Sequence, residues 1–203
     1  MPNYVSNTIC MKGIADLPLF TEKDGAKVFD FNKIIPMPKS LDVTSGSMET
    51  ISIAYYITER CTIPIPCLSF GRLGLLNRLC HESMGHADTL FCRTLTAAFR
   101  LDSDEAREEM YRNGEVYVSN FKKYGATTWY DWCRKNWGTK WNAVDTTIYG
   151  RDDEVSFDTA WAPPEPVVAK LAEMYPDTEI RHIWTYEDEP EAEFEKIYNE
   201  KEV

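Results

Sequence analysis

The side chains best suited to metal chemistry in this sequence are Cys80, His81, His86 and Cys92. Zinc needs four nitrogen or sulfur ligands in a tetrahedron, and proteins usually supply them as close pairs of the C-x-x-C kind. These four residues contain no such pair, and cysteine is a common small apolar residue on buried helix faces. We therefore predict that they pack in the core, reduced, with no metal site and no cofactor.

Nucleophilic catalysis by cysteine would need a base close to the sulfur. Cys80 and His81 are adjacent, and neighbouring residues on a helix point in different directions, so they cannot form such a pair. The sequence has no glycine-rich nucleotide loop, no serine elbow and no paired histidines on a helix. Asp152, Asp153 and Glu154 could hold a cation, but they lie in a predicted hairpin turn, where aspartate is common. We predict that the protein is not an enzyme.

Negative charge is concentrated at the C-terminal end of the chain. Residues 1–151 contain 18 basic and 17 acidic side chains, whereas residues 152–203 contain 4 basic and 16 acidic ones, which together give the net charge of −11. Such a region repels phosphates, so direct nucleic-acid binding through it is disfavoured, and it attracts basic protein surfaces. The alternative is a solvated edge that only keeps the protein soluble. The predicted partner-binding residues are those of the densest acidic run: Glu187, Asp188, Glu189, Glu191, Glu193 and Glu195.

A second candidate surface combines basic and aromatic side chains. Its cations are Lys122, Lys123, Arg134, Lys135 and Lys140, and tyrosines and tryptophans lie between them in the sequence. Rings beside cations can stack the bases of single-stranded nucleic acid. A nucleic-acid-binding module that uses this face is therefore our alternative function, although tryptophans are more simply explained as core residues.

Five of the six tryptophans lie between Tyr124 and Pro164. Because each ring can bury about 150–250 Å², we predict that this segment holds much of the core. Its first part is predicted to be a helix with a tryptophan face, ended by Gly138 in a left-handed cap. Residues 141–149 and 155–159 then alternate in polarity, which predicts two strands of a hairpin, and a helix follows from Pro166.

The rest of the chain divides into strands at both ends and helices between them. Residues 4–11 and 180–186 alternate as strands do, and residues 194–198 are predicted to be the hairpin partner of the latter. Residues 21–27 are predicted to be a polar loop. Residues 48–113 favour helices, the last of which is predicted to end at Gly114.

Length and composition place further limits on the chain. At 203 residues it is expected to form one domain. It contains no apolar run near the roughly 20 residues that a membrane helix needs. The N-terminus has neither a basic region nor an apolar run, so we expect no signal peptide and a cytoplasmic location.

Without its helical block, the chain has the order strand, helix, two strands, helix, strand. This order approximates the split βαβ plan of a ferredoxin-like α+β sandwich. We therefore predict an α+β fold: a ferredoxin-like antiparallel sheet with helices on one face and a helical insertion at about residues 48–114, within a single domain of residues 1–203.

Several long motifs are similar to those of the YubB ferredoxin-like family of phage and plasmid proteins. They are the Met-Pro-Asn start and the segments 29–38, 130–133, 136–143 and 157–164. Members often finish with a glycine-rich turn before the last strand, whereas this chain has Glu187 to Glu191 at that place. The resemblance implies the fold and a mobile-element origin, and it implies no established activity.

These observations together predict a non-enzymatic accessory protein of a phage or plasmid. We expect it to act in the cytoplasm of the host cell and to bind a host protein with a basic surface, with no membrane partner. The mobile-element origin implies a nucleic-acid-binding defence complex as the partner class, such as a CRISPR effector, and hence an anti-CRISPR or anti-restriction role.

Overall fold

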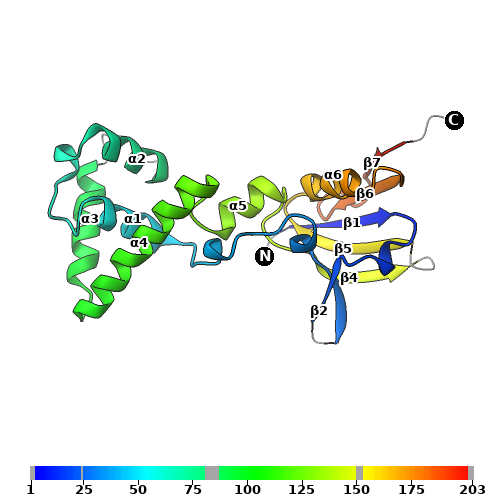
Figure 1. Ribbon diagram of the computed structural model, residues 1–203, viewed down its shortest axis with the longest axis horizontal. Coiled ribbons are helices and arrows are strands. Elements are labelled where there is room, and N and C mark those ends of the chain that lie inside the picture. Colours follow the sequence, from blue (N-terminus) through cyan, green and yellow to red (C-terminus); the bar gives the residue numbers. More distant parts are fainter. Residues whose placement is uncertain (1–2, 24, 81–86, 150–152, 201–203) are drawn as a thin grey trace. The chain divides into compact units, whose positions relative to one another are not determined.

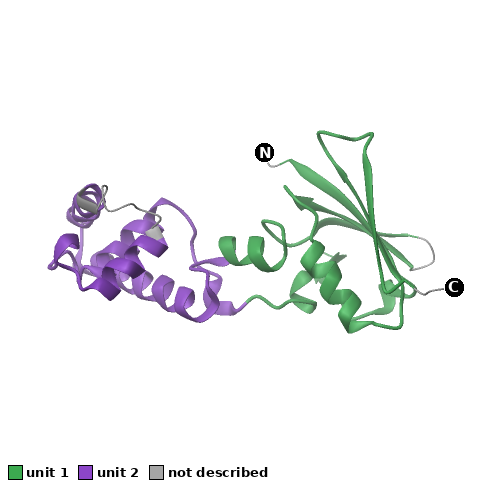
Figure 2. Ribbon diagram, turned by 90° about the horizontal axis from the view of Figure 1, so that it is seen from above, with its two compact units in different colours: residues 1–37, 130–203 green, residues 38–129 purple. Residues whose placement is uncertain are grey.

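The computed structural model describes residues 3–23, 25–80, 87–149 and 153–200 and divides the chain into two compact units (Figures 1 and 2). Unit 1 comprises residues 1–37 and 130–203, and unit 2 comprises residues 38–129. The helical unit therefore extends further in both directions than the insertion predicted at about residues 48–114.

Unit 1 contains most of the strands, and unit 2 contains the long helices. The elements of unit 1 are β1 (Tyr4–Cys10), η1 (Ile14–Asp16), β2 (Phe20–Lys23), β3 (Ala26–Phe29), η2 (Phe31–Lys33), β4 (Val144–Tyr149), β5 (Glu154–Ala160), α6 (Glu165–Met174), β6 (Ile180–Tyr186) and β7 (Glu193–Tyr198). Those of unit 2 are η3 (Lys39–Leu41), α1 (Ser47–Ile57), η4 (Ile65–Cys67), α2 (Phe70–Cys80), α3 (Ala87–Phe99) and α4 (Asp104–Tyr124), and α5 (Trp129–Asn136) follows at the boundary.

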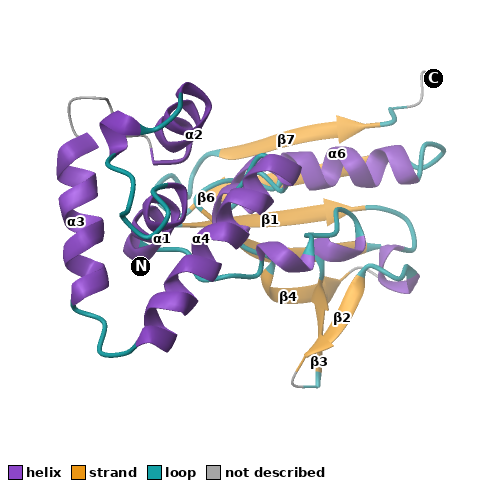
Figure 3. Cartoon of the chain, turned by 60° about the vertical axis from the view of Figure 1, so that its left-hand side comes forward, coloured by secondary structure: helices purple, strands orange, loops and turns teal. Residues whose placement is uncertain are grey.

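The main sheet has the order β4-β5-β1-β6-β7, and each neighbouring pair is antiparallel. The central strand β1 pairs with β5 on one side and β6 on the other, and α6 lies against the sheet (Figure 3). This is the ferredoxin-like order with β7 added at one edge. The α+β, ferredoxin-like fold that the sequence predicts is confirmed.

Burial alternates along the central strands, so only one face of the sheet is covered. In β1, Val5, Asn7 and Ile9 are buried, whereas the residues between them are partly or fully exposed. The strand β5 alternates in the same way over most of its length. The uncovered face is therefore polar, and the hydroxyls of Thr8 and Ser156 lie 2.9 Å apart across it.

Phenylalanines rather than tryptophans form the centre of unit 1. Phe29, Phe31 and Phe157 are all at most 2% exposed. The ring of Phe157 lies 5.1 Å from that of Phe29 and 5.8 Å from that of Phe31, measured between centroids. Trp132 and Trp137 are buried beside them, but Trp161 is 44% exposed. The segment predicted to hold much of the core therefore contributes Trp132, Trp137 and Phe157 to it but not Trp161.

Two predictions of local structure are wrong, and one is confirmed. Residues 21–27, predicted to be a loop, belong largely to the antiparallel hairpin of β2 and β3. Gly114 does not end a helix, because α4 continues through it to Tyr124. Because Gly114 has no Cβ, α1 can instead pack closely against α4 at this position. A Cβ there would lie 2.1 Å from the carbonyl oxygen of Ser52. Gly138 has the predicted left-handed conformation, with φ 81°.

Candidate protein-binding surface

The predicted acidic residues lie on the hairpin formed by β6 and β7. Glu187, Asp188, Glu189 and Glu191 occupy the connection between the strands, and Glu193 and Glu195 lie on β7. All six residues are exposed. The structure therefore places the acidic run on one hairpin at the edge of the sheet.

Two of these six carboxylates have partners inside the protein. The backbone N–H of Tyr4 donates to Glu187 Oε2 at 2.8 Å, and the backbone N–H of Glu187 donates to the Tyr4 carbonyl at 3.0 Å. These bonds hold the hairpin to the start of β1. Glu195 forms an ion pair with Arg181 of β6. Both side chains are more than one third exposed, so the pair contributes little to stability.

The other four carboxylates, of Asp188, Glu189, Glu191 and Glu193, make no ion pair or side-chain hydrogen bond with any part of the chain that the structure describes. Two further carboxylates of the same sheet, Glu154 and Asp158 of β5, lie on its uncovered face. Asp158 accepts a hydrogen bond of 2.8 Å from Ser6. We call the six predicted residues together with Glu154 and Asp158 the acidic surface.

A groove of about 480 Å³ opens beside the acidic hairpin, lined by Asn3, Val5, Trp161, Tyr186 and Asp188. Trp161 has a left-handed backbone, with φ 73°, which is a strained conformation for a bulky residue. Its backbone N–H donates to the Asn3 carbonyl at 2.9 Å. The groove thus combines the ring of Tyr186 with the carboxylate of Asp188, and the two together suit a cationic side chain.

The predicted basic and aromatic surface is divided between the units. Lys122 and Lys123 belong to unit 2, and Arg134, Lys135 and Lys140 belong to unit 1. In unit 1 the amino group of Lys140 lies 4.6 Å from the ring centroids of both Trp141 and Trp161. This cation already contacts aromatic rings of its own chain, which leaves less of those rings open to a nucleic-acid base.

The predicted metal and nucleophile candidates give no site in the described part of the chain. His81 and His86 lie outside the described residues, as does the side chain of Cys80. Cys92 is exposed, so its predicted burial is wrong. Of the hairpin-turn carboxylates, Asp152 lies outside the described residues, and Asp153 accepts a 2.5 Å hydrogen bond from the backbone of Gly13. No group of three or more potential metal ligands occurs among the residues that are described.

Burial makes the inner cysteine thiols unreactive. It raises the pKa of Cys133 to about 12. It also raises the pKa of Cys10 and of Cys61, although more weakly. Since the thiolate is the nucleophile, these three side chains are poor candidates for catalysis near neutral pH.

Unit 1 contains a buried histidine that sequence reasoning treated only as a strand residue. His182 is 0% exposed, and its Nε2 lies 3.1 Å from Asn7 Oδ1. The amide of Asn7 donates to Val5 and Thr159, so its oxygen must accept from the imidazole. The other ring nitrogen, Nδ1, has no hydrogen-bond partner among the residues that the structure describes. Desolvation lowers the pKa of His182 to about 4, and neutral imidazole is the form that fits this site.

The stability of unit 1 is expected to fall as the pH is lowered from 6.5 to 4. Across this window the unfolded chain binds a proton on His182 that the folded chain does not accept, which costs about 3 kcal/mol in total. Urea unfolding at pH 7, 5.5 and 4 would measure the loss. A His182→Gln variant should lack this part of the pH dependence, and equal slopes for both proteins would contradict the assignment.

The sheet order β4-β5-β1-β6-β7 shows that unit 1 is a ferredoxin-like α+β domain. Residues 136–199 match a family model described as the ferredoxin-like domain in Api92-like protein. This match includes β4 to β7, α6 and the acidic hairpin. A comparison with curated proteins gave no match.

Among solved structures, the chain is similar to the crystal structure of a protein api92 from Yersinia pseudotuberculosis. The two are 13% identical, with a TM-score of 0.38, over 98% of this chain and 94% of the other. The fold assignment therefore rests on the family match and the strand order. The association with phages and plasmids that the YubB resemblance implies stays a prediction. In the described residues, no helix is long and apolar enough to cross a membrane.

Proposed function

We propose that unit 1 is a non-enzymatic binding module whose acidic surface docks on a basic surface of another protein. The observation that carries this proposal is the group of exposed carboxylates without internal partners on the β6–β7 hairpin: Asp188, Glu189, Glu191 and Glu193. Exposed like charges repel one another, so crowding them on one hairpin weakens the isolated protein unless a cation approaches.

The distribution of charge between the units supports the same proposal. Unit 1 has 12 basic and 22 acidic residues, whereas unit 2 has 10 basic and 11 acidic ones. The excess of negative charge therefore belongs almost entirely to the ferredoxin-like unit. A field of this kind accelerates encounters with basic partners and selects against acidic ones.

The groove beside the hairpin supplies a contact of defined shape. An arginine or lysine side chain of the partner would lie against Tyr186 with its charge toward Asp188. A nucleic-acid-binding protein of a host defence system, such as a CRISPR effector, has the basic surface that this arrangement needs. We propose that class of partner, with a phage or plasmid origin and action in the host cytoplasm, on the strength of the family resemblance.

Neutralising the hairpin should weaken binding to a basic ligand about ten- to a hundredfold at low salt, because each exposed charge contributes a few tenths of a kcal/mol to about 1 kcal/mol. The variant carries Glu187→Gln, Asp188→Asn, Glu189→Gln, Glu191→Gln and Glu193→Gln. Fluorescence anisotropy with a labelled lysine-rich peptide measures the affinity at several salt concentrations, and capture from host lysate treated with nucleases then searches for the natural partner.

A control variant changes the net charge by the same amount elsewhere in unit 1. It carries Asp16→Asn, Glu22→Gln, Asp131→Asn, Asp177→Asn and Glu179→Gln, all at exposed positions outside the acidic surface. The control should bind the peptide nearly as tightly as the unmodified protein does. Equal losses in the two variants would mean that net charge alone attracts the peptide, and the proposed surface would be rejected.

A further inference from the structure

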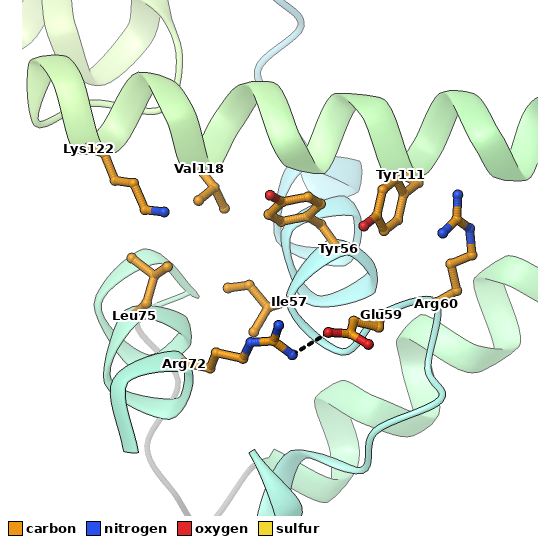
Figure 4. A pocket seen from close by; sticks show the side chains of 9 residues that line it. All are labelled: Tyr56, Ile57, Glu59, Arg60, Arg72, Leu75, Tyr111, Val118 and Lys122. Carbon is orange, nitrogen blue, oxygen red and sulfur yellow. Dashed lines mark ion pairs between the residues drawn. The ribbon is translucent and has the colours of Figure 1, made fainter. Parts of the chain in front are cut away.

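A basic and aromatic groove in unit 2 is separate from the acidic surface. Its first part, of about 320 Å³, lies between α1, α2 and α4 (Figure 4). Its second part, of about 600 Å³, continues along α2. Arg72, Leu75 and Lys122 line both parts, so the two parts adjoin each other.

Cations outnumber carboxylates along this groove. Arg60, Arg72, Arg78 and Lys122 line it, and Glu59 is the only acidic residue among the lining residues that the structure describes. Two of the cations are paired, Arg72 with Glu59 at 2.6 Å and Arg60 with Glu108 at 2.6 Å.

Arg78 and Lys122 have no carboxylate partner within the described residues. The guanidinium of Arg78 lies 5.2 Å from the ring centroid of Phe121. The side chain of Lys122 extends from α4 toward Leu75 in the groove (Figure 4). The groove can therefore accept negative charge at these two positions without breaking an ion pair.

Aromatic rings lie beside the cations. Tyr56 and Tyr111 line the first part, with ring centroids 5.1 Å apart, and the guanidinium of Arg60 lies 3.9 Å from the Tyr111 centroid. Phe70 lines the second part and is 93% exposed. A phenylalanine this exposed contributes almost nothing to the core, so its ring is free to contact a ligand.

The glycines of α2 independently indicate that a ligand can approach this helix closely. Gly71 and Gly74 line the groove, and a Cβ at either position would meet nothing within 4 Å. Glycine inside a helix is destabilising relative to alanine, so Gly74 weakens α2 with no packing reason among the residues that the structure describes. Gly114 is different, because its Cβ would collide with α1.

The turn after α1 brings two of the charged residues to the groove at a conformational cost. Glu59, Arg60 and Cys61 have φ values of 50°, 62° and 63°, so three successive non-glycine residues are left-handed. Such residues are unfavourable in this conformation and are concentrated at functional sites. The hydrogen bond from the Arg60 backbone N–H to the Tyr55 carbonyl, at 2.8 Å, helps to hold the turn.

We propose that this groove binds single-stranded nucleic acid. The phosphates of the nucleic acid lie along Arg72, Arg78 and Lys122. Because Gly71 and Gly74 have no side chains, the sugar-phosphate backbone can approach α2 closely there. A base stacks on Phe70. Cations that follow a groove between exposed rings are the usual arrangement for binding single strands without sequence preference. An acidic peptide would use the cations but not the ring, so the aromatic residue favours nucleic acid.

Binding would be measured by fluorescence anisotropy with a labelled 20-nucleotide single-stranded DNA and its RNA equivalent. The intact chain should bind at low salt, and the affinity should fall as salt rises, because phosphate contacts release counterions. The variant Arg78→Glu with Lys122→Glu should bind at least tenfold more weakly, with a salt slope smaller by about 1.4, since each single-strand contact contributes about 0.7.

Three further variants separate the possible explanations. Phe70→Ala should weaken binding roughly tenfold, as expected for a lost base stack. Gly74→Leu should also weaken binding, because it fills the groove, while circular dichroism shows the fold intact. Arg100→Glu with Arg112→Glu makes the same charge change on exposed residues outside the groove and should bind normally.

Four outcomes would overturn the proposal. They are no binding by the intact chain at low salt, an equal loss in the Arg100 and Arg112 control, full binding by Phe70→Ala, and binding of a polyglutamate peptide as tight as that of the oligonucleotide. The variant with the five neutral hairpin amides should still bind the oligonucleotide. Its result shows whether the groove acts independently of the acidic surface.

Discussion

Replacing Phe157 by alanine is expected to destabilise unit 1 by about 3–5 kcal/mol, as for other large aromatic residues removed from a core. Phe157 is 2% exposed and contacts the rings of both Phe29 and Phe31. Phe31 in turn lies 5.7 Å from the ring of Trp137. One substitution therefore leaves a cavity where β3, β5 and the segment after α5 meet, and the surrounding rings cannot collapse into it without moving strands.

Denaturant unfolding followed by tryptophan fluorescence would measure this loss, because Trp137 reports on the same cluster. Ile148→Ala on β4 is a suitable control, since Ile148 is only partly buried and should cost less. A loss below about 1 kcal/mol for Phe157→Ala would mean that the cluster is not the centre of the core.

The strands of unit 1 could be predicted from sequence because one face of the sheet is covered and the other is not. Residues such as Val155 and Phe157 alternate with polar ones, and the alternation marks both the strand and its buried face. The hairpin of β2 and β3 gave no such signal. Most of its residues are exposed on both faces, so charged side chains such as those of Glu22 and Lys23 are tolerated throughout.

The core residues were predicted less well, because size and apolarity do not determine burial. Trp161 follows β5 directly, in a left-handed conformation that directs the chain away from the sheet, and it remains 44% exposed. Phe29 and Phe31 come from a short segment with little periodicity of its own. They are buried because Asp30 between them fixes the turn, accepting from the backbone of Asn32 and from the side chain of Asn142.

The acidic hairpin could be found from sequence, whereas the groove of unit 2 could not. The six carboxylates are nearly contiguous, so a count of charges along the chain finds them. The groove instead brings together Arg60 from the turn after α1, Arg72 from α2 and Lys122 from α4. Only the packing of α1 against α4, and of α2 against α1, makes them neighbours, and no spacing within the sequence indicates it.

That packing depends on Gly114, and replacing it by alanine is expected to destabilise unit 2 by about 3 kcal/mol, since adding an atom to a close-packed helix contact forces the backbones apart. The added Cβ would lie 2.1 Å from the Ser52 carbonyl oxygen and 2.7 Å from Tyr56 Cβ. The neighbour on one side is backbone, which cannot rotate away as a side chain could, so α1 and α4 must separate.

Gly74→Ala is the matched control, because it makes the same chemical change on a helix where the new atom meets nothing within 4 Å. It should stabilise the protein by about 0.5–1 kcal/mol through helix propensity alone. Thermal unfolding of the two variants and of the unmodified chain tests both the expected loss of stability in Gly114→Ala and the expected gain in Gly74→Ala. If both variants gain stability, α1 and α4 do not pack as closely as described, and the groove between them loses its wall of Tyr56 and Tyr111. If Gly114→Ala alone is destabilised, it should also lose nucleic-acid binding, since separating the helices removes Lys122 from Arg72.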